Sequence, residues 1–232
     1  MDYRKDNLIF DPSKLLNYKV LFFIVFTVSL FIDLITQKSI LFLPLTLSTA
    51  ITGITTKWIT PRLNQFNFHQ IIRKEGPKEH FKKSKTPSIG GIIVIPVGLL
   101  IGYFASSNYL IKNQLIAIIF VSISFMLIGI FDDLLSISLK RNKGLEAKSK
   151  IILQLIIGII FLLYSYFSGL INTNISIFSN YSINFGLFFG PIALLIFLAE
   201  SNATNLTDGL DGLASGCGAL VFSGLAIELI LR

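Results

Sequence analysis

Apolar residues run along this chain in blocks of about 18 or more, separated by shorter polar segments. A helix crosses a bilayer with about 20 such residues, whereas a strand of a membrane barrel is shorter and alternates apolar with polar positions. The blocks show no such alternation. The pattern therefore predicts an all-α, polytopic membrane protein with about seven transmembrane helices, near residues 19–36, 39–58, 89–106, 113–131, 151–168, 183–199 and 213–231.

Composition supports a membrane protein. Of the 232 residues 53% are hydrophobic and only 14% are charged, against about 25% charged residues in a soluble domain. The segment before residue 19 is long and polar, and no small-residue cleavage site follows the first apolar block, so a cleavable signal peptide is not expected. We expect a single integral membrane domain over residues 1–232.

Positive charges gather in three polar segments, before residue 19, within 59–88 and within 132–150. With seven spans all three fall on one side of the membrane, which the positive-inside rule makes cytoplasmic. The same parity places residues 200–212 on that side. The net charge of +7 favours anionic lipid headgroups or phosphorylated substrates as partners over nucleic acid.

Two adjacent acids, Asp132 and Asp133, stand where an apolar block meets a basic segment. A carboxylate within the bilayer costs about 2.5–3.5 kcal/mol on insertion scales, so such acids face protein or water. Neighbouring carboxylates also repel unless they share a cation, and Mg²⁺, which takes oxygen ligands and bridges phosphates, would meet that need. The alternative is a solvated pair that ends the span.

A second polar cluster lies in the stretch LAESNATNLTDGLDGLASG, between two apolar blocks. Asp208 and Asp211 are three residues apart, as are Asn202 and Asn205, so each pair shares a face if the segment is helical. The glycine after each acid leaves room for a ligand and permits positive φ. Acids and amides without a neighbouring Lys or Arg suit a donor-rich ligand or a metal. The alternative is a helix-packing glycine motif with incidental acids.

Two basic segments are candidates for phosphate binding. In residues 73–92 lysines precede Thr86 at the start of a predicted helix, whose free backbone amides attract anions. In residues 140–154 either Lys143 or Lys148 could contact a phosphate. For both segments the alternative is a loop that only orients the protein in the membrane.

Together these pieces resemble the polyprenyl-phosphate N-acetylhexosamine-1-phosphate transferase superfamily, and within it the phospho-N-acetylmuramoyl-pentapeptide transferases. The matching motifs, in chain order, are Gly76-Pro77 with His80 and Thr86-Pro87-Ser88-Ile89-Gly90-Gly91, Asp132-Asp133, Lys143-Gly144-Leu145, and the stretch from Asn202 to Leu213. The first of them favours this branch over the N-acetylglucosamine-1-phosphate branch, which shares the acidic motifs and remains the alternative. The likeness runs from about residue 55 to the end of the chain.

The resemblance implies a Mg²⁺-dependent transfer of phospho-MurNAc-pentapeptide from UDP-MurNAc-pentapeptide to undecaprenyl phosphate, which yields lipid I and UMP for peptidoglycan synthesis. It implies a multi-pass protein of the bacterial plasma membrane with a cytoplasmic active site. A homodimer is a further expectation. Asp132 would act as acid and base on the lipid phosphate, assisted by Asp133. The expected substrate-binding residues are Asn202, Asn205, Asp208, Asp211, Lys143 and Thr86, and Asp208 is also the expected metal ligand.

Some features depart from the family pattern. Ser136 stands where members often carry a lysine, and Lys85 stands where a glycine usually precedes Thr-Pro. Members also continue into a further region with another metal-binding Asp and a histidine-rich loop. We therefore expect residues 1–232 to be an incomplete family core, with an inactive relative as an alternative. Residues 1–36 look additional and would place the amino terminus in the cytoplasm.

Two other function classes use acids at membrane depth. An intramembrane aspartyl protease needs a Gly-x-Gly-Asp signature, which Gly209-Leu-Asp211 does not supply. A cation-coupled transporter places its acids near the bilayer midplane, whereas Asp132, Asp133 and Asp208 lie at the ends of predicted spans. The sequence therefore favours the transferase over both.

Overall fold

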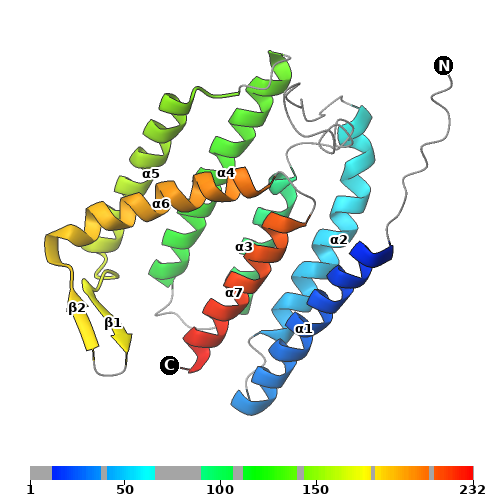
Figure 1. Cartoon of the computed structure of the whole chain (residues 1–232), viewed down its shortest axis with the longest axis horizontal. Coiled ribbons are helices and arrows are strands. Elements are labelled where there is room, and N and C mark those ends of the chain that lie inside the picture. The colour runs from blue at the N-terminus through cyan, green and yellow to red at the C-terminus, as the bar shows by residue number, and fades with distance from the viewer. Residues whose placement is uncertain are drawn as a thin grey trace. The chain divides into compact units, whose positions relative to one another are not determined.

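The computed structural model describes residues 12–37, 41–65, 90–106, 112–139, 144–178, 181–208 and 212–231. Within these ranges the chain forms α1 (Pro12–Thr36), α2 (Phe42–Gln65), α3 (Gly91–Ala105), α4 (Lys112–Ser138), α5 (Ala147–Phe167), β1 (Asn174–Phe178), β2 (Tyr181–Asn184), the 3₁₀ turn η3 (Gly186–Phe188), α6 (Phe189–Thr207) and α7 (Leu213–Leu231) (Figure 1). The predicted helical polytopic fold is confirmed, because each predicted span corresponds to one of these helices.

Among the described residues, five helices are long and apolar enough to cross a membrane, namely α1, α4, α5, α6 and α7. The apolar helix α3 is shorter, at 15 residues. The helices also outrun the predicted spans: α4 continues to Ser138 and α6 to Thr207. The ends of these helices therefore carry polar residues that the apolar runs alone assigned to loops.

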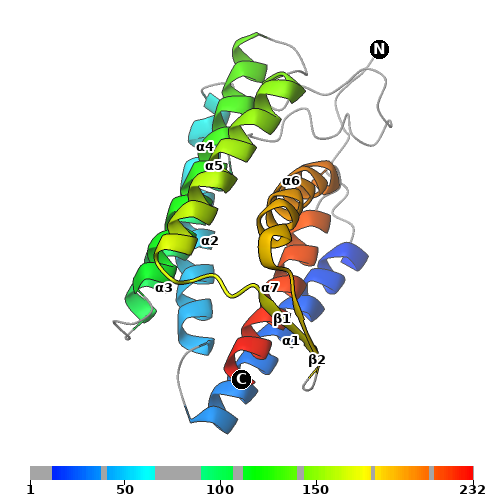
Figure 2. The same cartoon turned by 90° about the vertical axis from the view of Figure 1, so that its left-hand side faces the viewer.

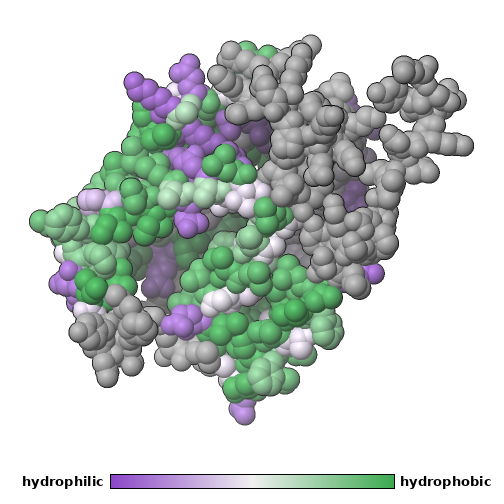
Figure 3. Space-filling model, in the orientation of Figure 1, coloured by the Kyte–Doolittle hydropathy of each residue, from purple (hydrophilic) through white to green (hydrophobic). Residues whose placement is uncertain are grey.

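Most apolar side chains of these helices point outward. Phe104, Leu195 and Phe167 are 80%, 68% and 81% exposed, and hydrophobic residues cover much of the surface in Figure 3. Apolar surface on this scale is rare on a soluble monomer. In a bilayer, lipid tails cover it at no cost, because they are as apolar as the side chains themselves.

Hydroxyl groups in the apolar helices bond back to their own helix. Thr27 Oγ1 donates to the carbonyl of Phe23 at 2.7 Å, and Thr36 Oγ1 donates to the carbonyl of Ile32 at 2.8 Å. A hydroxyl that faces lipid without a partner is costly. The bond to the carbonyl four residues earlier removes that cost, so these threonines fit a lipid-facing helix.

The chain divides into two compact units. The first comprises Met1–Thr46 and Thr207–Arg232, and in it α1 packs against α7. The second comprises Leu47–Leu206, and in it α4 packs against both α3 and α5. Figures 1 and 2 both show α4 and α5 side by side along their length. The expectation of one membrane domain stays a prediction.

The β-hairpin between α5 and α6 was not predicted from the sequence. β1 and β2 pair antiparallel, with Asn174 opposite Asn184. The side chain of Asn184 then accepts hydrogen bonds from Thr173 Oγ1 at 3.0 Å and from the backbone N–H of Gly186 at 2.8 Å. Strands of four and five residues are too short for an alternation to stand out from a neighbouring apolar run. The predicted span at 183–199 is therefore wrong at its start, since α6 begins at Phe189.

In the first unit, Asp33 closes the connection between α1 and α2. Its carboxylate accepts the backbone N–H of Phe42 at 2.8 Å and that of Leu41 at 3.1 Å. The first amides of a helix have no partner within the helix, and a carboxylate at this end both accepts their hydrogen bonds and complements the helix dipole. Asp33 is therefore the cap of α2, supplied from the end of α1.

Replacing Asp33 with Ala is expected to lower the free energy of unfolding by about 0.5–2 kcal/mol, the usual effect of losing such a cap. Asp33→Asn, which keeps one acceptor oxygen, should lie between that variant and the wild type. Thermal unfolding of the purified chain in detergent, followed by intrinsic fluorescence, measures the difference. An Asp33→Ala chain as stable as the wild type would contradict the capping role.

Candidate active site

Asp132 and Asp133 lie in the last two turns of α4, inside the helix and not in a loop after it. Successive residues of a helix point about 100° apart, so the two adjacent carboxylates leave α4 in different directions. The helix thus separates the predicted acidic pair and gives each acid its own surroundings.

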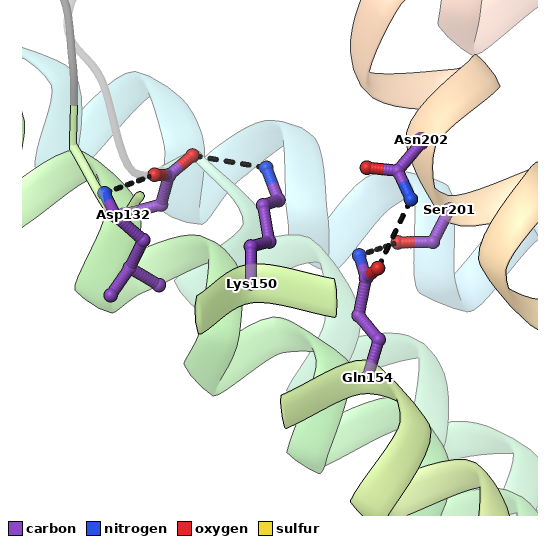
Figure 4. Close-up of polar contacts among 6 residues, drawn as sticks. Asp132, Lys150, Gln154, Ser201 and Asn202 are labelled. Atoms are coloured by element: carbon purple, nitrogen blue, oxygen red, sulfur yellow. Dashed lines mark hydrogen bonds and ion pairs between the residues drawn. The ribbon is translucent and has the colours of Figure 1, made fainter. Parts of the chain in front are cut away.

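Both carboxylate oxygens of Asp132 are held, one by the segment before α5 and the other by the first turn of α5. Oδ1 accepts the backbone N–H of Leu145 at 2.8 Å, and Oδ2 forms an ion pair with Lys150 Nζ at 3.1 Å (Figure 4). The side chains of Lys150 and Asp132 are only 15% and 25% exposed. Salt therefore screens this pair less than an ion pair on the surface. Each oxygen retains a second lone pair, so Asp132 can still accept a proton or a further hydrogen bond.

Gly144 brings this segment against Asp132. A Cβ atom at Gly144 would lie 2.5 Å from Oδ1 of Asp132 and 2.8 Å from its backbone carbonyl carbon, and closer still to its carbonyl oxygen. No side chain fits in that space, so only glycine permits the approach. The Lys-Gly-Leu motif found in the sequence thereby has a structural explanation, because the glycine allows contact and Leu145 donates its amide.

One face of α5 joins the acidic end of α4 to the polar end of α6. Lys150 and Gln154 are four residues apart and so lie on the same face, one turn from each other. Gln154 is 1% exposed; its Nε2 donates to Ser201 Oγ at 2.9 Å, and its Oε1 accepts from Asn202 Nδ2 at 3.0 Å. Figure 4 shows the two sets of contacts next to each other. Asp132 and Asn202 are thus gathered by neighbouring turns of a single helix.

Next to these polar contacts, apolar side chains pack α6 against α4 and α5. Gly158, one turn after Gln154, leaves space that Leu194 of α6 fills, since a Cβ there would lie 2.8 Å from Leu194 Cδ2. The ring of Phe197 pairs with those of Phe161 and Phe125, with centroids 5.3 Å and 6.1 Å away. Aromatic pairs at these distances add to the hydrophobic term. The packing fixes where Asn202, five residues after Phe197, is presented.

The other predicted site residues are distributed as follows. Asn205 lies in the last turn of α6, so the helical spacing assumed for Asn202 and Asn205 is confirmed. Asp208 follows α6 directly along the chain. Gly212 has φ +77°, a conformation that favours glycine, as predicted for this stretch. Three predicted residues lie outside the described residues: Thr86, Lys143 and Asp211.

Sequence reasoning missed Lys150, Gln154 and Ser201. It placed the phosphate-directed cation at Lys143 or Lys148, and Lys148 is exposed in the first turn of α5. The available signal was the spacing of Lys150 and Gln154, two polar residues on one face at the start of an apolar helix. That signal names a face but gives no partner, so the contacts with α4 and α6 required the fold.

The donor atoms of this site suit a hard cation. Among the residues that the structure describes, no group of three or more His, Cys, Asp or Glu could hold a metal ion. Mg²⁺, however, is commonly held by one or two carboxylates together with substrate phosphates and water. The groups gathered here are carboxylate and amide oxygens, which are the ligand type that Mg²⁺ takes.

Gly144→Ala is expected to push Asp132 away from Leu145 and Lys150. The loss of hydrogen bonds to a partly buried carboxylate should lower the free energy of unfolding by about 1–3 kcal/mol. Thermal unfolding in detergent measures this, with Gly129→Ala as the matched control. Gly129 lies in the same helix as Asp132 and has no atom within 4 Å of an added Cβ. The control should be neutral or slightly more stable, since alanine favours a helix. Equal stability of both variants would show that Gly144 does not support Asp132.

Comparison with known proteins gives a consistent family assignment. A family described as Glycosyl transferase family 4 matches residues 115–232. The chain is 58% identical over 209 residues to a phospho-N-acetylmuramoyl-pentapeptide-transferase of Prochlorococcus marinus (strain SARG), an alignment covering 90% of this chain and 56% of that protein. A protein of the same name from strain MIT 9313 is 46% identical over 209 residues, with the same shares. Another from strain NATL2A is 42% identical over 239 residues, covering 99% of this chain and 63% of its own length.

The chain thus spans somewhat more than half the length of the relatives it matches. The family match covers half of the chain and includes Asp132, Lys150 and Asn202. These are the residues that the structure brings together on one face of α5. The resemblance drawn from the sequence motifs is therefore confirmed, and the chain belongs to glycosyl transferase family 4.

Proposed function

We propose that this chain carries the catalytic aspartate and part of the donor site of a phospho-N-acetylmuramoyl-pentapeptide transferase. The reaction would move phospho-MurNAc-pentapeptide from UDP-MurNAc-pentapeptide to undecaprenyl phosphate and release UMP. The observation that carries the proposal is that Lys150 of α5 holds the carboxylate of Asp132, and that Gln154, one turn further along α5, binds Asn202. The names of the relatives support the choice of substrates.

In this reaction an oxygen of the lipid phosphate attacks the sugar-bearing phosphorus of the donor. The bond between that phosphorus and the oxygen bridging to the uridine phosphate breaks, and UMP leaves with the oxygen. Asp132 would take the proton of the lipid phosphate, because its carboxylate is anchored and still has free lone pairs. Asp133, on the neighbouring position of α4, would assist.

Lys150 would serve the same step in two ways. Its ammonium group has three donors, and the contact with Asp132 uses one of them. The ion pair holds the carboxylate in one orientation, which is a large part of what general acid–base catalysis requires. The remaining donors could meet the negative charge of a phosphate, as phosphoryl transfer demands.

The donor would lie along the polar end of α6 and the segment after it. Asn202 and Asn205 would supply amide groups, and Asp208 and Asp211 carboxylates, with Lys143 and Thr86 contributing from the basic segments. Bound Mg²⁺, with Asp208 as a ligand, would neutralise charge on the diphosphate. The lipid phosphate and a soluble nucleotide would meet at the cytoplasmic leaflet, on the side to which the positive-inside rule assigns the basic segments.

The test is a transfer assay with radiolabelled UDP-MurNAc-pentapeptide, undecaprenyl phosphate and Mg²⁺, read as labelled lipid and released UMP. The chain should be assayed alone and joined to the remaining carboxyl-terminal part of the 58% identical relative. We expect transfer by the joined protein. Failure of the joined protein to transfer the label, or its preference for a UDP-N-acetylglucosamine donor, would contradict the proposed function.

In the same assay Lys150→Met should lower kcat by about 100-fold or more, the usual scale of losing support for an acid–base group. Lys148→Met removes a cation two residues away that is exposed in the first turn of α5, and it should stay within about twofold of wild type. Equal effects of the two substitutions would show that charge in this segment matters but the contact with Asp132 does not.

A further inference from the structure

Among the described residues, the only side chain of less than 2% exposure is polar, namely Gln154 of α5. An amide removed from water destabilises a protein unless its donors and acceptor are bonded. The Gln154 amide bonds to Ser201 and Asn202, which both belong to α6. Gln154 therefore does more than fill space, because it joins two helices through hydrogen bonds that have a direction.

The direction of these bonds follows from a backbone carbonyl. Asn202 Nδ2 lies 2.8 Å from the carbonyl oxygen of Leu198, and a carbonyl only accepts, so the nitrogen of the Asn202 amide must face it. The second hydrogen of the same nitrogen is donated to Gln154 Oε1. The oxygen of Gln154 must therefore face Asn202, which leaves its nitrogen to donate to Ser201 Oγ.

This order consumes both hydrogens of the Asn202 amide and leaves its oxygen as the group on offer. Figure 4 shows that oxygen turned away from Gln154, toward the side on which the ammonium group of Lys150 ends. Asn202 is held as an acceptor and cannot act as a donor. Ser201 supports this order without setting it. Its hydroxyl accepts the N–H of Gln154, and without that acceptor a buried N–H is left unpaired, which weakens the hold of Gln154 on Asn202.

We infer that Gln154 and Ser201 are positioning residues that hold the Asn202 amide with its oxygen facing the site, where it accepts an N–H or O–H group of the nucleotide-sugar donor. The part of this inference that concerns the substrate rests on the proposed function. The orientation of the amide does not, since it follows from hydrogen bonds within the protein.

Kinetics separate this role from a purely structural one. In the joined protein, Ser201→Ala should raise KM for UDP-MurNAc-pentapeptide by about tenfold, the scale expected for one lost hydrogen bond. KM for undecaprenyl phosphate should not change. Ser201→Thr keeps the hydroxyl and should restore the donor KM, while Gln154→Met should raise it at least as much as Ser201→Ala does. Ser165→Ala is the matched control, because Ser165 is a buried serine at the other end of α5.

A spectroscopic measurement tests the amide orientation in the chain itself. With ¹⁵N-labelled asparagine in detergent micelles, the side-chain NH₂ signals of Asn202 are assigned by their loss in Asn202→Ala. Both protons should exchange slowly with solvent in the wild type and in Ser165→Ala. In Ser201→Ala the signals should shift and the protons exchange faster.

The outcomes distinguish the inference from the proposed function. Unchanged Asn202 signals in Ser201→Ala would overturn the inference whether or not the joined protein transfers phospho-MurNAc-pentapeptide. Changed signals with an unchanged donor KM, or with both KM values raised together, would overturn its substrate part. A joined protein without transfer would defeat the proposed function, while the signals would still decide the orientation.

Discussion

The ion pair between Asp132 and Lys150 is the contact on which the candidate site depends. It holds a carboxylate from the end of α4 between helices, where both side chains are largely withdrawn from solvent. Removing one partner from such a pair leaves the other charge without compensation, which costs more than the pair itself contributes. The same carboxylate also holds the segment before α5, because it accepts the backbone N–H of Leu145. One turn further along, Gln154 binds α6. The acid of α4 and the amide of α6 therefore keep their relation to each other through α5.

This arrangement reconciles a polar site with an apolar molecule. Lipid tolerates the exposed Phe, Leu and Ile side chains, and the helices satisfy their own backbone and hydroxyl groups. The polar contacts between helices can therefore serve to position the residues of the site. Glycine allows them at two places: Gly144 lets the loop reach Asp132, and Gly158 lets α6 approach α5. In both cases the close approach places a polar group at a defined point of the site.

The helices and the acidic motifs could be predicted from the sequence, because long apolar runs and the spacing of acids are local features. The ends of α4 and α6 could not be predicted. The length of an apolar run reflects the thickness of the hydrocarbon core, whereas the backbone hydrogen bonds of a helix continue beyond that run. The ion-pair partner of Asp132 was not predicted, because which of the nearby lysines reaches it depends on the phase of α5. For Gln154 the spacing from Lys150 indicates a helix face but no partner, because Ser201 is 47 residues away. The cytoplasmic orientation of the site stays a prediction.

The most direct test of the central contact is zero-length coupling with a carbodiimide, which joins a carboxylate to an amine only where the two touch. The chain would be treated in membranes, digested and examined by mass spectrometry for linked peptides. We predict a link between Asp132 and Lys150 that disappears in Asp132→Asn, with Lys148 unlinked. Coupling of Asp132 to Lys148 in place of Lys150 would contradict the arrangement of α4 and α5 described here.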